Sequence, residues 1–216
     1  MARTPASPVA PRVSPPDLPS VLAPAAPARR ADLVAARLDL RGEVDLAHAT
    51  LEQCVLSADA DAVDLTGATL LDVDVSDARI ASLGLRNATV RRLRLTRGRI
   101  GTLDLSGAHV SELELRDLRI DYLTLGGATA HDVLVVDTSI RTLDVPQAEL
   151  ARVRFEGCRS DEVDTRGLRA SDADLRGLDA LAYTDTNSLR GITLTVFQVQ
   201  QLAPVLAAGA GILVTD

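Results

Sequence analysis

The residues that most readily suggest metal binding or covalent catalysis are three histidines and two cysteines in this 216-residue chain. They are His48, His109, His131, Cys54 and Cys158. Their spacing matches no zinc-ligand pattern, and two cysteines make no disulfide framework. We therefore expect neither a metal nor a cofactor, and we expect Cys158 to fill a small position in the core.

Sequence motifs for nucleotide and acyl chemistry are also missing. The G-A-G at 209–211 is not followed by a helix, so it fails as a dinucleotide fingerprint. No P-loop and no G-x-S-x-G nucleophile motif occurs. Asp and Glu total 30 residues, but a catalytic carboxylate pair also needs a concave pocket. The sequence predicts a protein that is not an enzyme.

A stretch that could bind a polyanion is ATVRRLRLTRGRI, residues 88–100. It places five arginines between positions 91 and 99, in a chain whose formal net charge is -7. Such a cluster could contact nucleic acid, or it could pair with acidic residues of neighbouring elements. Aromatic residues make up only 2%, which argues against a single-strand stacking platform. Choosing between the two interpretations requires the spatial neighbours of the arginines.

A five-residue repeat positions those neighbours. Apolar residues recur at every fifth position from Leu65 to Ile120, and an apolar or small residue precedes each of them by two positions. Neither the helical period of 3.6 nor the strand period of 2 keeps this phase. The pattern predicts short extended segments with two inward side chains, each followed by a turn.

Longer periods indicate that four such segments close one coil. Isoleucine recurs at Ile80, Ile100, Ile120 and Ile140. Residues that tolerate positive φ recur at the same interval, mostly Gly and Asn: Gly67, Asn87, Gly107, Gly127, Gln147 and Gly167. We therefore expect coils of twenty residues stacked about 4.8 Å apart, so that residues n and n+20 touch.

These pentads resemble the pentapeptide-repeat family, whose pattern is roughly A-(D/N)-L-x-x. The clearest matches are ADLRG (173–177), VDLTG (63–67), LDLSG (103–107) and LDLRG (38–42), and the resemblance covers about 38–185. It implies an all-β fold, a right-handed quadrilateral parallel β-helix. The chain departs from the family pattern in its scarcity of Phe and in an early phase slip, which predicts a bulge or loop near Asp59–Ala62.

Three domains are predicted. Residues 1–33 form a Pro/Ala-rich flexible tail, since eight of the ten prolines lie within 5–27. Residues 34–187 form the β-helix. Residues 188–216 form a helical cap, because an open solenoid end exposes apolar side chains. In that cap we expect Thr195 as N-cap, and we expect Pro204 to break or kink the helix or to begin a second short helix. The expected inward face is Phe197, Val199, Leu202, Val205 and Leu206.

Stacking at n+20 explains most of the arginines structurally. It places Arg92 between Asp72 and Glu112, Arg94 between Asp74 and Glu114, and Arg97 between Asp77 and Asp117. Opposite charges one strand spacing apart oppose register slips. We therefore expect no direct contact with nucleic acid.

Two columns of like charge are the candidate partner-binding residues. The arginine strip comprises Arg79, Arg99 and Arg119, continued through Ser139 to Arg159, and the aspartate column comprises Asp64, Asp104, Asp144 and Asp164. Stacked like charges are unfavourable unless nearby acids such as Asp77 and Asp117 compensate, or an anionic partner binds.

The expected partner is a protein. The resemblance implies that the chain could mimic duplex DNA and bind a type II topoisomerase such as DNA gyrase, as some relatives do. Residues 1–31 contain four arginines and one aspartate and so carry a charge of +3. Because the net charge of the chain is -7, the remaining residues carry -10. The alternative is a structural or scaffolding module, and the resemblance also suggests a homodimer through the C-terminal cap. With no apolar run near 20 residues, no membrane contact and a cytoplasmic location are expected.

Overall fold

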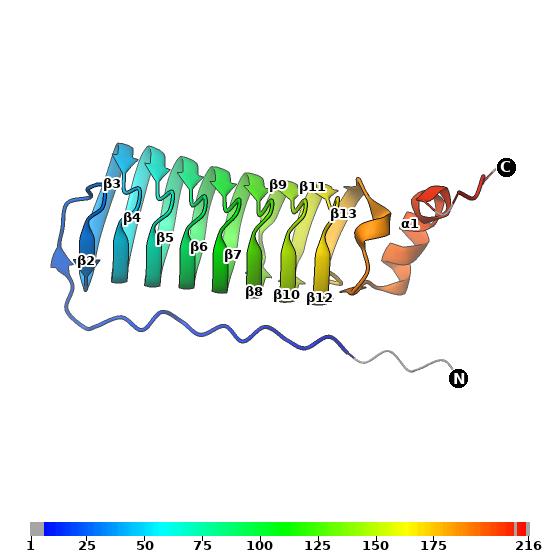
Figure 1. The fold of residues 1–216 in the computed structure, drawn as a ribbon, viewed down its shortest axis with the longest axis horizontal. Helices are drawn as coiled ribbons and strands as arrows, with labels where there is room; N and C mark the ends of the chain where they lie inside the picture. The colour runs from blue at the N-terminus through cyan, green and yellow to red at the C-terminus, as the bar shows by residue number, and fades with distance from the viewer. Residues whose placement is uncertain (1–6, 210, 215–216) are drawn as a thin grey trace.

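A single stack of parallel β-coils forms the body of the protein, with an extended N-terminal segment along its side and a helix at its C-terminal end (Figure 1). The computed structural model describes residues 7–209 and 211–214. Its elements are β1 (Ala23–Pro24), β2 (Asp32–Val34), β3 (Ala36–Asp45), β4 (Thr50–Asp64), β5 (Thr69–Gly84), β6 (Thr89–Asp104), β7 (His109–Thr124), β8 (Thr129–Val136), β9 (Ser139–Asp144), β10 (Glu149–Glu156), β11 (Cys158–Asp164), β12 (Arg169–Asp174), β13 (Leu178–Tyr183), the 3₁₀ turn η1 (Thr186–Ser188), β14 (Ile192–Thr193) and α1 (Val196–Gly209). The parallel β-helix implied by the pentads is confirmed.

Strand pairing follows the predicted twenty-residue register. Ile80 pairs with Ile100, Ile100 with Ile120, and Ile120 with Ile140. These isoleucines are buried, and the same column structure repeats for the leucines and alanines of the core. Because stacked aliphatic side chains fill the interior, the core needs almost no aromatic residues.

The early phase slip appears as two register shifts. Leu38 pairs with Leu56, eighteen residues on, and Leu51 pairs with Leu70, nineteen residues on. The register changes opposite Asp61 in the β3–β4 pair and between Leu56 and Asp59 in the β4–β5 pair. The bulge predicted near Asp59–Ala62 is therefore confirmed, and it brings the chain to the regular twenty-residue coil.

Backbone of positive φ recurs at more corners than the sequence indicates. The predicted turn column behaves as expected, with Asn87 at φ 54° and Gly107 at 67°. A second column also has positive φ throughout, and we call it the left-handed column: Asp72, Arg92, Glu112, Asp132, Arg152 and Asp172, at 53–62°. Its residues carry a Cβ, so their conformation is held by tertiary contacts and not by glycine.

The N-terminal segment differs from the flexible tail expected from its composition. Residues 8–19, which we call the strap, lie extended along the coils (Figure 1). The strap makes four backbone hydrogen bonds to carboxylates of the left-handed column. Strand β1 follows it and pairs with β3, so the solenoid also begins earlier than residue 34. The first six residues of the tail lie outside the described residues.

The cap helix α1 begins where predicted but presents a different face. The Thr195 hydroxyl accepts the N–H of Gln198, and the Gln198 side chain accepts the N–H of Thr195, a reciprocal capping box. The helix continues through Pro204, so the predicted break does not occur. Leu202 is buried, while Phe197 is 66% exposed. The reason is that Gln198 binds the carbonyls of Leu175 and Leu178, which turns the 198/202/206 face inward.

Candidate functional site

Two hollows on the surface adjoin one another along the arginine strip. Two open hollows of about 680 Å³ each share Gly98 and Arg99 as lining residues. We call them together the groove. Arg79 lines one end, and Arg119, Ser139 and Arg159 line the other. The structure therefore places the predicted arginine strip along a single depression.

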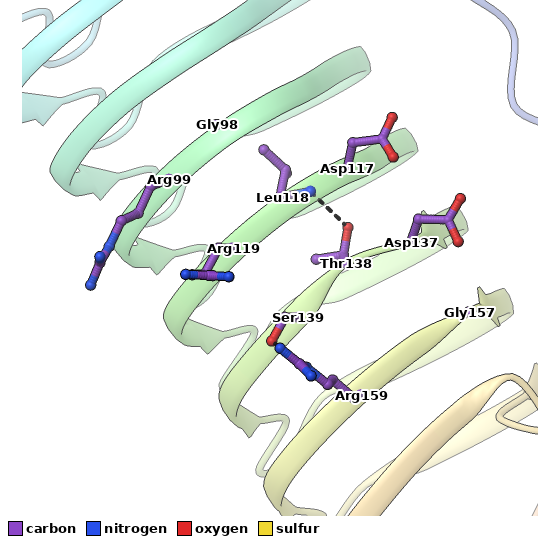
Figure 2. A pocket seen from close by; sticks show the side chains of 10 residues that line it. All are labelled: Gly98, Arg99, Asp117, Leu118, Arg119, Asp137, Thr138, Ser139, Gly157 and Arg159. Atoms are coloured by element: carbon purple, nitrogen blue, oxygen red, sulfur yellow. Dashed lines mark hydrogen bonds between the residues drawn. The ribbon is translucent and has the colours of Figure 1, made fainter.

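The floor of the groove is set by one small residue in an inward column. That column reads Ala78, Gly98, Leu118, Thr138 and Cys158. Gly98 has φ +141°, and a Cβ there would lie 2.2 Å from the carbonyl oxygen of Ala78. The Thr138 hydroxyl donates to the Val136 carbonyl at 2.8 Å and accepts the N–H of Leu118 at 3.4 Å (Figure 2). Neither Gly98 nor Thr138 is among the site residues predicted from the sequence, although a Gly and a Thr that interrupt an apolar column are a signal that could identify them.

The two rims of the groove carry opposite charges. Figure 2 shows the side chains of Arg99, Arg119 and Arg159 along one rim, and those of Asp117 and Asp137 along the other. The rims are parallel because each follows one column of the twenty-residue register, and the acidic column is interrupted by Arg97 between Asp77 and Asp117. The groove is thus a linear, two-signed polar surface.

Only part of the arginine strip is compensated within the chain. Arg99 pairs with Asp121 at 3.3 Å, and Arg159 donates to the Ser139 hydroxyl at 3.0 Å. Among the described residues, neither Arg79 nor Arg119 has a carboxylate oxygen within 4 Å. The Asp77 carboxylate, expected to compensate the strip, instead pairs with Arg97 at 2.9 Å. Stacked guanidinium groups are therefore left to attract anionic groups from outside.

The aspartate column has a structural use in its own turns. The carboxylates of Asp64, Asp104 and Asp164 each accept the N–H two residues ahead, at 2.9, 2.9 and 3.0 Å. Asp144 accepts the Tyr122 hydroxyl, which raises the pKa of that tyrosine.

Arginines also neutralise part of the aspartate column. Asp104 pairs with Arg86 at 2.7 Å, and Asp164 pairs with Arg166. The column is in register along one side, but Gly84 and Thr124 interrupt it, so only Asp144 and Asp164 are direct neighbours. Two of the four aspartates are paired with a cation.

Three other arginines of residues 88–100 each pair with the acid in the preceding coil and not with the acid in the following one. Arg92 reaches Asp72 at 2.6 Å, Arg94 reaches Asp74 at 2.6 Å, and Arg97 reaches Asp77. Two of the three acids predicted on their far side bind elsewhere. Glu112 accepts the N–H of Ser14, and Glu114 pairs with Arg116. The predicted register is right, while each arginine pairs with one acid and not with two.

The described residues add nothing that would support metal or thiol chemistry. They contain no group of three potential metal ligands. Cys54 and Cys158 are buried, and burial raises the pKa of both thiols. None of the helices in the part of the chain described is both long enough and apolar enough to cross a bilayer.

Comparison with solved structures gives distant matches. No family model matches the chain, and no curated protein matches it. Two structures of trypsin-treated QnrB1, a plasmid-mediated fluoroquinolone resistance protein, share 16% and 15% identity. They cover 82% and 89% of this chain and 98% and 100% of theirs, each with a TM-score of 0.34.

A third structure is HetL, a pentapeptide repeat protein involved in heterocyst differentiation regulation from the cyanobacterium Nostoc sp. strain PCC 7120. It shares 13% identity and covers 76% of this chain and 90% of its own, with a TM-score of 0.24.

Proposed function

We propose that this pentapeptide-repeat β-helix acts by binding another protein and not by catalysis. The observation that carries the proposal is the groove, where uncompensated Arg79 and Arg119 stand beside a parallel aspartate rim. An extended protein segment carrying carboxylates, with occasional basic residues, fits both rims. The filled aliphatic core supports the same conclusion, because it gives the solenoid a rigid outer surface on which such a contact needs no reorganisation.

Charge reversal of the arginine strip tests the groove as the contact surface. The variant combines Arg79→Glu, Arg99→Glu and Arg119→Glu. A control of equal charge change uses three exposed arginines outside the groove lining: Arg91→Glu, Arg169→Glu and Arg190→Glu. Proteins captured from native lysate at low salt are purified and measured individually. The proposal requires that at least one captured protein binds both the wild type and the control variant about tenfold or more tightly than it binds the groove variant. Equal binding to all three would contradict it.

The second candidate function is binding to DNA gyrase. The aspartate column of this chain would then be the surface that contacts the enzyme. The supporting observation is that Asp64, Asp104, Asp144 and Asp164 lie in one column along one side of the acidic body, with Gly84 and Thr124 between the first three. Against a duplex, which carries one charge per about 1.7 Å, the column is sparse and partly neutralised by Arg86 and Arg166. A basic DNA-binding surface would still attract it at low salt.

A supercoiling assay with purified gyrase tests this second candidate. The wild type should inhibit supercoiling or protect the enzyme from quinolones, and the effect should weaken with added salt. Asp64→Asn combined with Asp144→Asn should reduce it, while the groove variant should leave it unchanged. An excess of wild-type protein without any effect would remove gyrase as the partner and would leave the groove proposal standing.

We also propose a second copy of the chain as a partner at the C-terminal cap. Phe197, Val199 and Val205 of α1 are exposed, and Leu181 of β13 is 78% exposed. Apolar side chains gathered at one end favour self-association. Sedimentation should show a concentration-dependent dimer, and Phe197→Asp should shift it to monomer. A wild-type chain that stays monomeric at high concentration would rule out the dimer.

A further inference from the structure

The strap crosses the stacked coils and is bound through its backbone. Four of its N–H groups donate to carboxylate oxygens of the left-handed column: Val9 to Asp172 at 3.0 Å, Arg12 to Asp132 at 2.9 Å, Ser14 to Glu112 at 3.2 Å and Asp17 to Asp72 at 2.9 Å. A fifth bond runs the other way, from the Gln53 side chain to the Asp17 carbonyl at 3.0 Å. Hydrogen bonds to ionised acceptors are the stronger kind, so this is a specific contact.

The repeat of the strap matches the repeat of the solenoid. Val9 and Asp17 are eight residues apart, which a polyproline II backbone covers in about 25 Å. Their acceptors, Asp172 and Asp72, are five coils apart, or about 24 Å. A helix would cover only about 12 Å over the same residues. The donors are spaced by three, two and three residues, close to the three residues per turn of polyproline II.

The composition of the strap suits this mode of binding. Its five prolines, Pro8, Pro11, Pro15, Pro16 and Pro19, favour the extended conformation before binding and so lower the entropy cost of docking. Proline has no N–H, so these residues add no donor that docking would leave without a partner. Pro16 is buried against the body, and Pro8, Pro11 and Pro19 are half-buried.

Two of the four acceptor carboxylates, those of Asp72 and Asp132, are also held by arginines of the coils. Arg92 pairs with Asp72 and Arg152 pairs with Asp132, each at 2.6 Å. These two arginines occupy the coils at which the strap makes no hydrogen bond to the column. Each therefore fixes a carboxylate of the preceding coil, whose other lone pairs point to the strap. Asp132 binds both Arg152 and Arg12 with the same oxygen, Oδ1.

We propose that the left-handed column is a binding site for polyproline II peptides, and that the strap is its tethered ligand. The site selects an extended, proline-rich segment whose free N–H groups are spaced three, two and three residues apart. A separate peptide of the strap sequence binds the same site and exchanges with the strap. This inference concerns a different corner of the coil from the groove and does not depend on the proposed function.

Tryptic cleavage after Arg12 tests the docking in the intact protein. Val9→Pro combined with Ser14→Pro removes two donors and keeps the polyproline backbone. The matched control is Ala10→Pro, because the Ala10 N–H has no hydrogen-bond partner among the described residues. We expect cleavage of the Arg12–Val13 bond to accelerate about tenfold or more in the double variant and less than about twofold in the control. A wild-type strap cut as fast as the free peptide, or equal acceleration in both variants, would overturn the proposal.

Exchange is tested with a fluorescent peptide of residues 7–20. A tethered ligand acts at millimolar effective concentration, so the wild-type strap should largely exclude the peptide. The protein carrying Val9→Pro and Ser14→Pro should bind it about tenfold or more tightly than the wild type. The same peptide with both prolines introduced should bind neither protein. If the unmodified peptide fails to bind the double variant, or if both peptides bind equally, the column is not a peptide site.

Discussion

Arg152 and Asp132 are twenty residues apart in sequence and form a two-point ion pair between adjacent coils. Nε of Arg152 lies 2.7 Å from Oδ1 of Asp132, and Nη2 lies 2.6 Å from Oδ2. The same carboxylate accepts the N–H of Arg12 and contacts the His131 ring. One buried acid therefore joins two coils and the strap. The Arg152 guanidinium, as the main cause, lowers the pKa of Asp132 well below its usual range.

Removing the charge of Asp132 should destabilise the fold, while the same change at an exposed pair should not. Asp132→Asn keeps the shape of the side chain but weakens its bonds to Arg152 and Arg12. Because the Asp132 side chain is only 8% exposed, we expect a loss of about 1–3 kcal/mol in the free energy of unfolding. Asp77 makes the same n+20 contact to Arg97, but its side chain is 67% exposed. Asp77→Asn should be close to wild type in urea unfolding.

Equal losses at the two sites would contradict the idea that burial decides the strength of these stacked pairs. If neither variant lost free energy of unfolding, the ion pairs would not add stability, and their remaining role would be to disfavour shifted strand registers.

Acid should weaken the fold through carboxylates that arginines hold ionised. The Arg166 side chain, with help from its own N–H and the Thr184 hydroxyl, lowers the pKa of Asp164 to about 2. An unfolded Asp titrates near pH 3.9. The contribution of Asp164 is therefore fully present above about pH 4 and is lost as the pH falls towards about 2. The urea concentration at the unfolding midpoint, measured from neutral pH to about pH 2.5, should decrease as the pH is lowered below about 4.

Asp164→Asn provides the control for that titration. The variant should be less stable at neutral pH and should lose less stability between about pH 4 and about pH 2.5 than the wild type. A variant with the full wild-type acid dependence would show that other groups cause it.

A charge in the isoleucine stack should prevent folding. Ile120 is 1% exposed and lies between Ile100 and Ile140. Ile120→Asp places a carboxylate in a dry core, where several kcal/mol of desolvation is uncompensated. Ile120→Val, the control, removes one methylene group and should cost about 0.5–1.5 kcal/mol. Circular dichroism and thermal melting distinguish the two, and a near-wild-type melt of Ile120→Asp would contradict the stacked core.

The groove floor should not tolerate a methyl group at Gly98. Gly98→Ala would bring a Cβ against the Ala78 carbonyl in a backbone conformation that alanine rarely adopts, at a cost of about 1–3 kcal/mol. Gly127→Asn is the matched control, because Gly127 has open space and Asn87 already occupies its column at φ 54°. It should change the melting temperature little. Similar melting of the two variants would mean that the floor can shift.

The register could be predicted because it depends on residue types that repeat. The isoleucines at intervals of twenty residues, the phase slip near Asp59 and the capping Thr195 each carry a local signal, and each is found in the structure. The contact face of α1 carried a misleading signal. The apolar character of Phe197 predicts that it faces the body, but the polar Gln198 faces the body instead, because its side-chain amide donates to the carbonyls of Leu175 and Leu178.

The sequence by itself determined which residues stack, because in a solenoid the nearest neighbour in space lies at a constant sequence separation. It therefore determined the core, the acids that lie one coil away from each arginine and the alignment of the arginine strip. Only the tertiary structure decided where the strap lies and which arginines stay uncompensated. Those outcomes depend on backbone N–H groups and on the choice of one partner among several acids, and neither is encoded in a residue type at a fixed spacing.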